Sequence, residues 1–275
     1  MREWKLKKVI QILTACLAMI VVLNVSGISM KTMQTIDINK KESKTNRRDS
    51  NLQMESETRE TISRILNEQI QTELPQIAIT FDDGPKTSVT SRILDSLQAN
   101  GGRATFFMLG SNVNANAGVI RRMVDQGCEV ANHTHDHKYL TKIGAEGIVS
   151  QVGSTNQKIQ AVCGVSPVLM RPPGGYIDGA SLNVLGSMGM PAIMWSIDTR
   201  DWQHRNAQRT IDTVLSQVKD GDIILMHDIY STTADAAVVL IPELTARGYQ
   251  LVTVSELAAY RGGIAPGHKY SQFRP

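Results

Sequence analysis

Two adjacent carboxylates, Asp82 and Asp83, follow a short apolar run at 77–81 and precede Gly84 and Pro85. The run is rich in β-branched residues and too short for a helix, so it predicts a buried strand that carries both acids at its carboxyl end. Such a pair can divide the work of a hydrolase, because one acid can hold a metal ion while the other accepts a proton from water. The alternative is a structural Asp-Gly-Pro turn whose acids bond only to backbone amides.

A second polar cluster, His133-Thr134-His135-Asp136-His137, follows another predicted strand. His133 and His137 are four residues apart, which places two imidazoles on one side of a single turn, as two ligands of one divalent ion require. Together with Asp83 they provide three protein ligands and leave one coordination position open, which is typical of a catalytic zinc site. We therefore expect Zn²⁺, with Co²⁺ as the alternative ion. Pairing of His133 with His135 remains open if the strand runs on into this cluster.

The elements that must position these clusters alternate along the chain. Helical patterns fill most of the intervals between expected strands at 76–81, 103–109, 128–132, 167–171, 191–197, 222–227 and 249–253. This alternation predicts an α/β fold with a parallel sheet, either open or closed into a distorted (β/α) barrel of about seven parallel strands. In both cases the polar clusters meet at the carboxyl ends of the strands.

The first helix of the domain is predicted directly after the Asp-Gly-Pro turn. Gly84 permits a sharp change of direction, and Thr87 or Ser88 can cap the helix that follows. Its buried face should carry the apolar residues that recur at helical spacing, namely Val89, Ile93, Leu94 and Leu97.

The residues before the first strand have a different composition. Basic residues precede an apolar run at 9–25, which predicts a signal anchor or a cleaved signal peptide within 1–30. Both outcomes place the body outside the cytoplasm, tethered to the plasma membrane or secreted. A lipoprotein cleavage site before Cys16 is a third alternative. Beyond this segment we expect a polar tether at 31–60, an amphipathic helix at 61–75, the main domain at 76–262 and a C-terminal tail at 263–275.

The composition is that of a globular protein, with 41% hydrophobic and 20% charged residues in a chain of 275. Residues 1–50 hold 10 Lys and Arg against 4 Asp and Glu, whereas residues 51–275 hold 19 against 22. The body therefore has no basic excess for nucleic acid, and we expect a monomer without a nucleic-acid partner. Cys128 and Cys163 could form a disulfide outside the cell, but we expect two buried free thiols.

Taken together, the motifs resemble the polysaccharide deacetylase family, also called the NodB-homology domain or carbohydrate esterase family 4. The resemblance rests on Thr80-Phe81-Asp82-Asp83-Gly84-Pro85 and His133-Thr134-x-x-His137, followed in order by Arg171-Pro172-Pro173, Asp198-x-x-Asp201-Trp202 and Leu225-Met226-His227. It implies a distorted (β/α) barrel and metal-dependent removal of N-acetyl or O-acetyl groups from a glycan. Peptidoglycan, chitin and acetylated xylan are the substrate classes known for the family.

The resemblance also implies a role for each matching residue. The metal ligands are the three already named, and Asp82 would be the general base. His227 would be the general acid for the leaving amine, with Asp201 beside it to favour the imidazolium. Arg171 would pair with Asp82, orient it and hold it ionised.

The implied substrate contacts lie in the same motifs. In the commonest family form a tyrosine follows the two prolines, whereas here Gly174 and Gly175 stand before Tyr176. The oxyanion donor of the family is a backbone N–H at this place, which Gly174 can still supply, and Tyr176 is the expected sugar contact. Leu225 and Trp202 resemble the walls of the acetyl pocket.

We therefore expect a metal-dependent hydrolase that removes N-acetyl groups from a cell-wall glycan, namely peptidoglycan N-acetylglucosamine. The apolar segment favours this substrate, because an enzyme tethered at the membrane lies beside its own cell wall. One alternative is an O-acetyl xylan or chitooligosaccharide deacetylase, and another is a non-catalytic carbohydrate-binding domain. The sequence contains all the acids and histidines that the chemistry needs, which argues against a non-catalytic domain.

Overall fold

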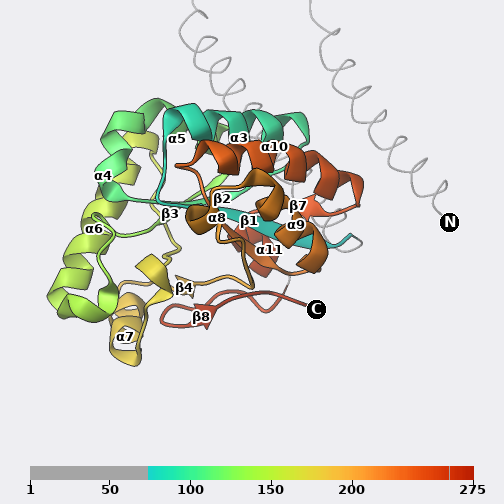
Figure 1. Ribbon diagram of the computed structural model, residues 1–275. Helices are drawn as coiled ribbons and strands as arrows, with labels where there is room; N and C mark the ends of the chain where they lie inside the picture. The colour runs from blue at the N-terminus through green and yellow to red at the C-terminus, as the bar shows by residue number, and fades with distance from the viewer. Residues whose placement is uncertain (1–73, 260) are drawn as a thin grey trace, which may run out of the picture. The chain divides into compact units, whose positions relative to one another are not determined.

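The computed structural model describes residues 74–259 and 261–275 of the chain. The segments expected at 1–30 and 31–60, and nearly all of the helix expected at 61–75, lie outside these residues. In the described part of the chain, no helix has the length and apolar character that crossing a membrane requires. The described residues cover the predicted main domain and the segment after it, and their elements are labelled in Figure 1.

A parallel β-sheet forms the centre of the domain, with β1 (Gln76–Asp82) as its middle strand (Figure 1). Every residue of β1 is buried, as expected for a parallel strand covered on both faces. The strand order is β3-β2-β1-β6-β5, and β7 also pairs with β1. These strands are β2 (Thr105–Met108), β3 (Glu129–Asn132), β5 (Ile197–Asp198), β6 (Ile223–His227) and β7 (Gln250–Leu251). The predicted α/β class and parallel sheet are confirmed.

The strands expected at 167–171 and 191–197 are shorter than the sequence indicates. The first is reduced to a bridge at Met170, which pairs with Asn132 on one side and Ala192 on the other. The second breaks after β4 (Ala192–Ile193), and its later residues turn to pair with β6 as β5. Met170 and this bent segment thus connect the two edges of the sheet, which brings Arg171 to the end of β1.

Helix α3 (Thr87–Ala99) begins where the sequence predicts, directly after the turn that follows β1. The prediction of its cap is wrong, because Lys86 is the N-cap residue and makes no side-chain capping bond. The Thr87 hydroxyl instead donates to the Asn116 side chain at 2.7 Å. The predicted buried face is confirmed, with Val89, Ile93, Leu94 and Leu97 all buried.

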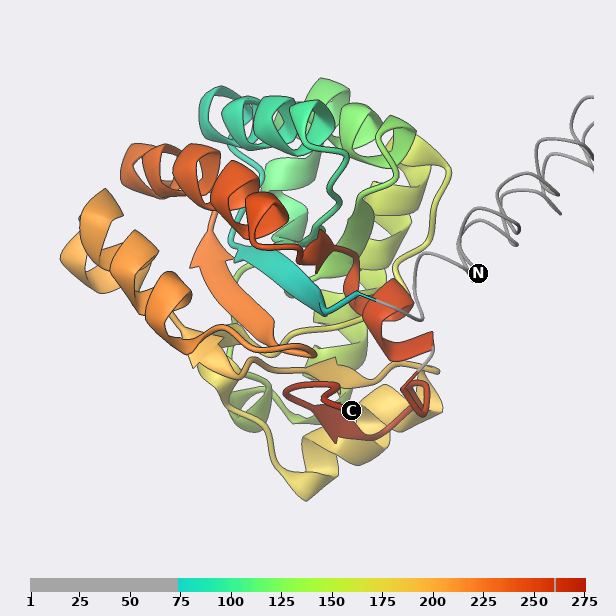
Figure 2. The ribbon, with the colours of Figure 1, turned by 90° about the vertical axis from the view of Figure 1, so that its right-hand side faces the viewer.

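Helices α3 and α10 (Ser231–Ala246) lie side by side over one face of the sheet (Figure 2). Both contribute to the larger hydrophobic cluster, which also takes side chains from the covered face of β1 and β6. The remaining helices are α4 (Gly110–Val113), α5 (Ala117–Asp125), α6 (Gly144–Cys163), α7 (Gly179–Ser187), α8 (Asp201–His204), α9 (Ala207–Gln217) and α11 (Val254–Ala259). The core holds the strands rigidly, so the loops at their carboxyl ends have fixed starting points.

The segment expected as a C-terminal tail, 263–275, is packed against the domain. β8 (Lys269–Tyr270) pairs with β4, and Phe273 is buried in a hydrophobic cluster. The Phe273 N–H donates to the Gly221 carbonyl at 2.8 Å, and Gly221 has a φ of 87°. A Cβ on Gly221 would lie 2.2 Å from the Phe273 carbonyl oxygen, so this close approach of two backbones requires glycine.

Gly221→Ala should lower the free energy of unfolding by at least about 2 kcal/mol, because both the left-handed backbone and the contact with Phe273 oppose a side chain. Gly248 is the matched control, since its φ is 89° but nothing lies within 4 Å of its Cβ position. Gly248→Ala should cost only about 1 kcal/mol, from the backbone conformation alone. Urea denaturation measures both values, and equal costs would contradict the role of the contact.

The two cysteines of the domain are free thiols, as the sequence predicts. Cys128 is buried beside β3, as predicted, but Cys163 ends α6 and is only partly buried, so the prediction that both thiols are buried is wrong for Cys163. Burial raises the pKa of the Cys128 thiol to about 11, so this group stays protonated at neutral pH.

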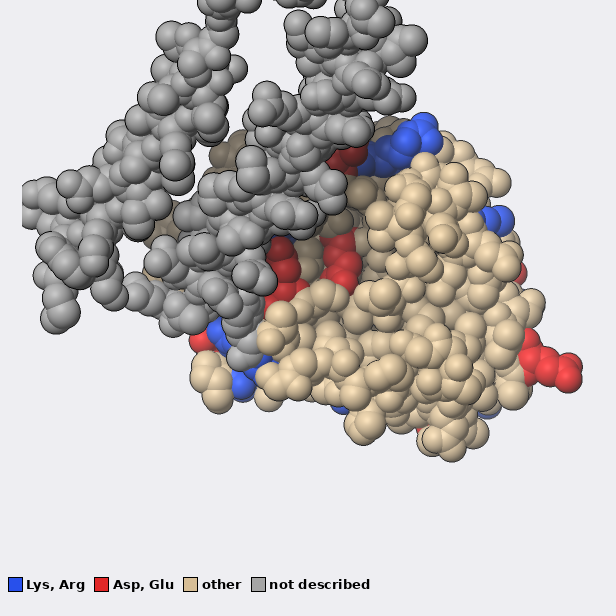
Figure 3. Space-filling model, turned by 180° about the vertical axis from the view of Figure 1, so that it is seen from behind, with Lys and Arg blue, Asp and Glu red and all other residues tan. Residues whose placement is uncertain are grey.

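Charged side chains on the surface are scattered. Figure 3 shows, on the face seen from behind, separate groups of Lys and Arg rather than a continuous basic stripe. Several basic residues that are exposed or partly exposed pair with acids, as in Arg92–Asp235, Arg122–Asp95 and Arg247–Glu243. Exposed pairs of this kind contribute little stability, so the notable charges of the domain are the buried ones.

Candidate active site

The expected site residues gather at the carboxyl ends of the parallel strands. Asp82 ends β1, His133 directly follows β3, and His227 ends β6. Arg171 follows the bridge at Met170, and Asp201 begins α8 shortly after β5. The sheet thus brings together residues that are far apart in the sequence.

Asp83, His133 and His137 lie in one group at this edge. The Nε2 atoms of both histidines are 3.4 Å from the Asp83 Oδ1 atom, and the three ligand atoms lie within 4.8 Å of one another. Asp83 and His137 have backbone φ values of 69° and 57°, a conformation that non-glycine residues adopt at a cost and that is concentrated at functional sites. The structure therefore groups the three residues that the sequence indicates as metal ligands.

The chemistry of this group fits a cation. The His133 Nδ1 atom is 2.7 Å from the Arg171 carbonyl oxygen, which can only accept, so the proton is on Nδ1 and the Nε2 lone pair is free. Burial lowers the pKa of His133 to about 3, so its ring is neutral near pH 7. The buried Asp83 Oδ1 atom has no hydrogen-bond partner among the described residues. Lone pairs of Asp83 and His133 therefore face each other with no proton between them, an arrangement that a divalent cation stabilises.

His135 is not a member of this group. Its Nε2 atom is 2.7 Å from the Lys158 ammonium, and its Nδ1 atom is 2.8 Å from the Asp136 carboxylate. Both ring nitrogens are thus engaged by other side chains. The pairing of His133 with His135, which the sequence left open, does not occur in the structure.

His133→Ala is expected to remove most of the bound metal, because a site with three protein ligands has none to spare. His135→Ala is the matched control, since it removes a histidine of the same loop whose ring nitrogens face Lys158 and Asp136. Metal content per protein after dialysis, measured by mass spectrometry, tests both variants. Loss of metal from His135→Ala but not from His133→Ala would show that the ligands are assigned wrongly.

Asp82 and Arg171 form a buried ion pair beside this group. The Arg171 Nη1 atom donates to Asp82 Oδ1 at 2.8 Å, and the two side chains are 4% and 0% exposed. Arg171 also donates to the Thr80 hydroxyl and to the carbonyls of Ile193 and Met194. Burial raises the pKa of Asp82, and the lowering by the Arg171 charge does not offset it. The expected pairing is present, but the net shift makes Asp82 a stronger base than an exposed aspartate.

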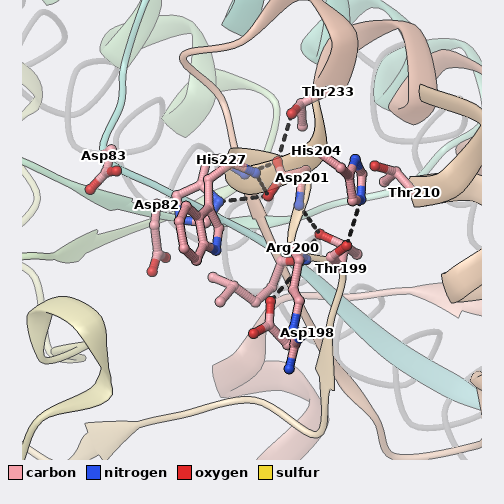
Figure 4. Close-up of polar contacts among 12 residues, drawn as sticks. Asp82, Asp83, Asp198, Thr199, Arg200, Asp201, His204, Thr210, His227 and Thr233 are labelled. Atoms are coloured by element: carbon pink, nitrogen blue, oxygen red, sulfur yellow. Dashed lines mark hydrogen bonds and ion pairs between the residues drawn. The ribbon is translucent and has the colours of Figure 1, made fainter. Parts of the chain in front are cut away.

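His227 and Asp201 form the second charged pair of the site, and Figure 4 shows His227 lying between Asp82 and Asp201. The His227 Nδ1 atom is 2.8 Å from Asp201 Oδ1, and the backbone N–H of His227 donates to Asp201 Oδ2 at 2.8 Å. The Thr233 hydroxyl donates to the same Oδ2 atom at 2.6 Å. Burial opposes the charge on His227, but the hydrogen bond to Asp201 and its negative charge outweigh burial and raise the pKa of His227 to about 9. His227 is therefore charged at neutral pH.

The four expected substrate contacts lie on two sides of the site. Trp202 in α8 is 48% exposed, and its backbone N–H donates to the Asp201 carboxylate at 2.9 Å. Leu225 is buried in β6, two residues before His227. Gly174 and Tyr176 instead belong to the loop after Arg171, where Gly174 lies in the 3₁₀ turn Pro173–Gly175. Trp202 and Leu225 thus lie on the same elements as Asp201 and His227, whereas Gly174 and Tyr176 lie in the loop that follows Arg171.

Sequence reasoning missed three residues that lie in or beside the site. Thr233 holds Asp201, and the Tyr139 ring centroid lies 6.1 Å from that of His137. Asp228 is buried, accepts a hydrogen bond from the Thr90 hydroxyl at 2.6 Å, and has its pKa raised by burial to about 7. Asp228 was visible as an acid directly after His227, but Thr233 and Tyr139 lie on a helix and a loop whose paths the sequence does not reveal.

Comparison with known proteins assigns the family. Residues 69–193 match the family described as Polysaccharide deacetylase. A peptidoglycan-N-acetylglucosamine deacetylase of Bacillus cereus is 37% identical over 190 residues, which cover 67% of this chain and 89% of that relative. The chain belongs to the polysaccharide deacetylase family. The resemblance that its five motifs carry is thereby confirmed.

Two other members of the family are similar in sequence or structure. The peptidoglycan-N-acetylmuramic acid deacetylase PdaC of Bacillus subtilis is 42% identical over 198 residues, covering 72% of this chain and 42% of that relative. The solved structure of PdaC matches with a TM-score of 0.65 over 67% of this chain and 90% of that one. A family 4 acetyl xylan esterase from Clostridium thermocellum, in complex with a cobalt ion, matches with a TM-score of 0.67 and 32% identity over 72% of this chain and 98% of that one. The chain thus spans less than half the length of the whole PdaC protein.

Proposed function

We propose that this chain removes N-acetyl groups from the N-acetylglucosamine of peptidoglycan. The observation that carries the proposal is the group of Asp83, His133 and His137, flanked by the buried carboxylate of Asp82 and by the charged imidazole of His227. Hydrolysis of an amide needs a base for the water and an acid for the leaving nitrogen, and these two residues supply both.

Asp83, His133 and His137 would hold a divalent metal ion, for which we propose Zn²⁺ with Co²⁺ as the alternative. One carboxylate and two imidazoles suit either ion, and three protein ligands leave a position open. When bound, such an ion would polarise the acetyl carbonyl and lower the pKa of a coordinated water. The cobalt ion named for the Clostridium thermocellum structure supports a divalent ion in a domain of this fold.

Asp82 would accept the proton of the attacking water. Arg171 occupies its Oδ1 atom, while its Oδ2 atom lies 3.7 Å from the His133 Nε2 atom and faces the metal ligands. The raised pKa strengthens Asp82 as a base, and Arg171 fixes its orientation. The carboxylate would therefore accept the proton without a change of rotamer.

His227 would protonate the leaving nitrogen, because an amine is a poor leaving group until it carries a proton. Its Nδ1 atom is held by Asp201, so Nε2 would donate the proton to the substrate. The pKa of about 9 keeps His227 protonated near neutral pH, as an acid requires. The Gly174 N–H would stabilise the developing oxyanion, and Trp202 and Leu225 would line the acetyl group.

The relatives support a cell-wall glycan as the substrate. Those from Bacillus subtilis and Bacillus cereus are named as deacetylases of the N-acetylmuramic acid and N-acetylglucosamine of peptidoglycan, respectively. We choose N-acetylglucosamine because the relative so named is matched over 89% of its length, whereas PdaC is matched over 42%. The acetyl xylan esterase shows that this fold also serves another glycan, which makes acetylated xylan the comparison substrate.

Acetate release by the purified protein tests the proposal. The substrates are peptidoglycan, chitooligosaccharide and acetylated xylan, each with added zinc and with a chelator. We expect release from peptidoglycan to be fastest and to stop with the chelator. Faster release from xylan would replace the proposed substrate, and no release from any glycan would favour a non-catalytic carbohydrate-binding domain.

Asp201→Asn should move the alkaline limb of the pH–rate profile to lower pH. The negative charge of Asp201 raises the pKa of His227, so its removal lowers that pKa and the charged acid is lost at a lower pH. Profiles of kcat/KM for the parent and the variant on an N-acetylated oligosaccharide measure the shift. If the alkaline limb stays in place, His227 is not the general acid.

We further propose that the domain acts outside the cytoplasm, held at the plasma membrane by residues 9–25. The basic residues before this apolar run support that orientation, since positive flanks stay in the cytoplasm. Fractionation of cells that express the full chain tests this. Recovery from the medium instead of the membrane would show that the segment is cleaved.

A further inference from the structure

Residues 133–137, which carry both histidines of the metal group, form a loop with a strained backbone. Thr134 and His137 have φ values of 66° and 57°. Non-glycine residues adopt this conformation at a cost, and it persists only where the surroundings fix it. His135 and Asp136 form a bend between these two positions. The place of His137 in the metal group therefore depends on what holds the bend.

The two histidine ligands are held in different ways. The His133 ring is buried, and its Nδ1 atom is fixed by the Arg171 carbonyl at 2.7 Å. The His137 side chain is 39% exposed. In the described part of the chain, its ring contacts the rings of His133 and Tyr139 and the Asp83 carboxylate, but it forms no hydrogen bond. The orientation of His137 thus comes mainly from the backbone of its loop.

Gln151, in α6, holds the bend through both ends of its side-chain amide. Its Oε1 atom accepts hydrogen bonds from the backbone N–H groups of His135 and Asp136, each at 3.0 Å. Its Nε2 atom donates to Asp136 Oδ2 at 3.1 Å. Donors face the amide oxygen and an acceptor faces the amide nitrogen, so only one orientation of the amide satisfies all three bonds. One side chain therefore fixes both residues that lie between the strained positions.

Helix α6 also holds the start of the loop, through Asn132. The Asn132 Nδ2 atom donates to the Val152 carbonyl at 2.9 Å and to Asn156 Oδ1 at 2.7 Å. Its Oδ1 atom accepts from the Thr134 N–H at 2.8 Å. The helix thus supports the loop at two places, and Gln151 is the support that reaches the residue directly before His137.

We propose that Gln151 is a positioning residue, which sets the affinity of the site for its divalent ion by holding the loop that presents His137. This inference rests on the metal group of the proposed function but does not depend on catalysis. Residues that orient metal ligands from outside commonly change metal affinity by about 10- to 100-fold when they are replaced. Loss of the Gln151 bonds should therefore weaken metal binding while the domain remains folded.

Competition with a chelator, measured on the purified full chain, gives the Kd for zinc. Gln151→Met keeps the length of the side chain but removes its three hydrogen bonds, and we expect it to raise this Kd about 10- to 100-fold. Gln157→Met is the matched control, because Gln157 is an exposed residue of the same helix. It should leave the Kd unchanged.

Exchange of the two side chains gives a second test. In the double variant Asp136→Asn with Gln151→Glu, the new carboxylate can accept from both backbone N–H groups, and the new amide can donate to it. The hydrogen bonds and the total charge of the pair are thus retained, and the Kd for zinc should lie within about threefold of the parent. This variant should recover binding even though neither original residue is present.

Thermal unfolding of the metal-free proteins separates positioning from a merely structural role. We expect Gln151→Met to unfold cooperatively near the temperature of Gln157→Met. A lower unfolding temperature with a Kd for zinc within about twofold of the parent would overturn the inference, as would an exchanged pair that binds as weakly as Gln151→Met. Zinc binding that depends on Gln151 in a chain that releases no acetate would retain the inference and reject the deacetylase proposal.

Discussion

Asp82→Asn is expected to keep its metal and to lower kcat by about 10²- to 10⁴-fold. The amide fills the same space beside Arg171 but cannot accept a proton from water. Asp82 Oδ1 is already bound to Arg171, and the metal group is formed by other residues, so binding of the metal should survive. Acetate release and metal content, measured on the same preparation, give both values.

Asp198→Asn is the matched control for this variant. Asp198 ends β5 near the site, but within the described part of the chain its carboxylate accepts a hydrogen bond only from the Arg200 backbone, and it has no part in the proposed chemistry. Its turnover should stay close to that of the parent. Near-normal acetate release by Asp82→Asn would show that another group accepts the proton of water. Loss of metal from Asp82→Asn would show that both Asp82 and Asp83 are metal ligands.

His227→Ala should lower kcat/KM on an N-acetylated oligosaccharide by about 10²- to 10⁴-fold, and on an aryl acetate by less than about tenfold. The reason is the leaving group, since an amine must be protonated before it departs and a phenolate need not be. The ratio of the two losses therefore isolates the acidic role from general damage to the site. Steady-state kinetics on both substrates measures this ratio.

His268→Ala serves as the control, because His268 is exposed in the C-terminal segment and its ring forms a hydrogen bond, among the described residues, only with the Pro266 carbonyl. Both activities should persist in that variant. Similar losses on the amide and on the aryl ester in His227→Ala would reduce His227 to a residue that binds substrate or maintains structure.

The polar motifs were predictable because each directly follows a strand with a strong apolar pattern. Asp82, His133 and His227 sit at strand ends, and a parallel sheet places such ends on one edge whatever the loops do. The sequence therefore indicated which residues meet at this edge, including the group of Asp83, His133 and His137. Whether His135 joins this group needed the structure to decide, because its ring contacts Lys158 instead.

What the sequence could not show depends on long-range contacts that local patterns do not encode. The break between β4 and β5 follows from pairing with two different neighbours, Met170 on one side and β6 on the other. The segment 263–275 has few apolar residues, and it is held by the pairing of β8, by the buried Phe273 side chain and by backbone contacts with Gly221. The contacts of the Tyr139 ring with those of His137 and Tyr176 likewise depend on the paths of two loops, which local sequence patterns do not encode.

The several hydrogen bonds of Arg171 limit which substitutions this domain can accept. Its guanidinium joins Asp82 and Thr80 of β1 to the carbonyls of Ile193 and Met194, so one side chain both ties β1 to the bent segment and orients the Asp82 carboxylate. Lysine has no planar fork with which to replace these bonds, and a smaller residue would leave buried acceptors and a buried charge unpaired. Mutational scans of position 171 should therefore report loss of soluble protein together with loss of activity. Directed evolution of altered glycan preference has more freedom at exposed Trp202 than at this position, where tolerance to substitution should be lowest.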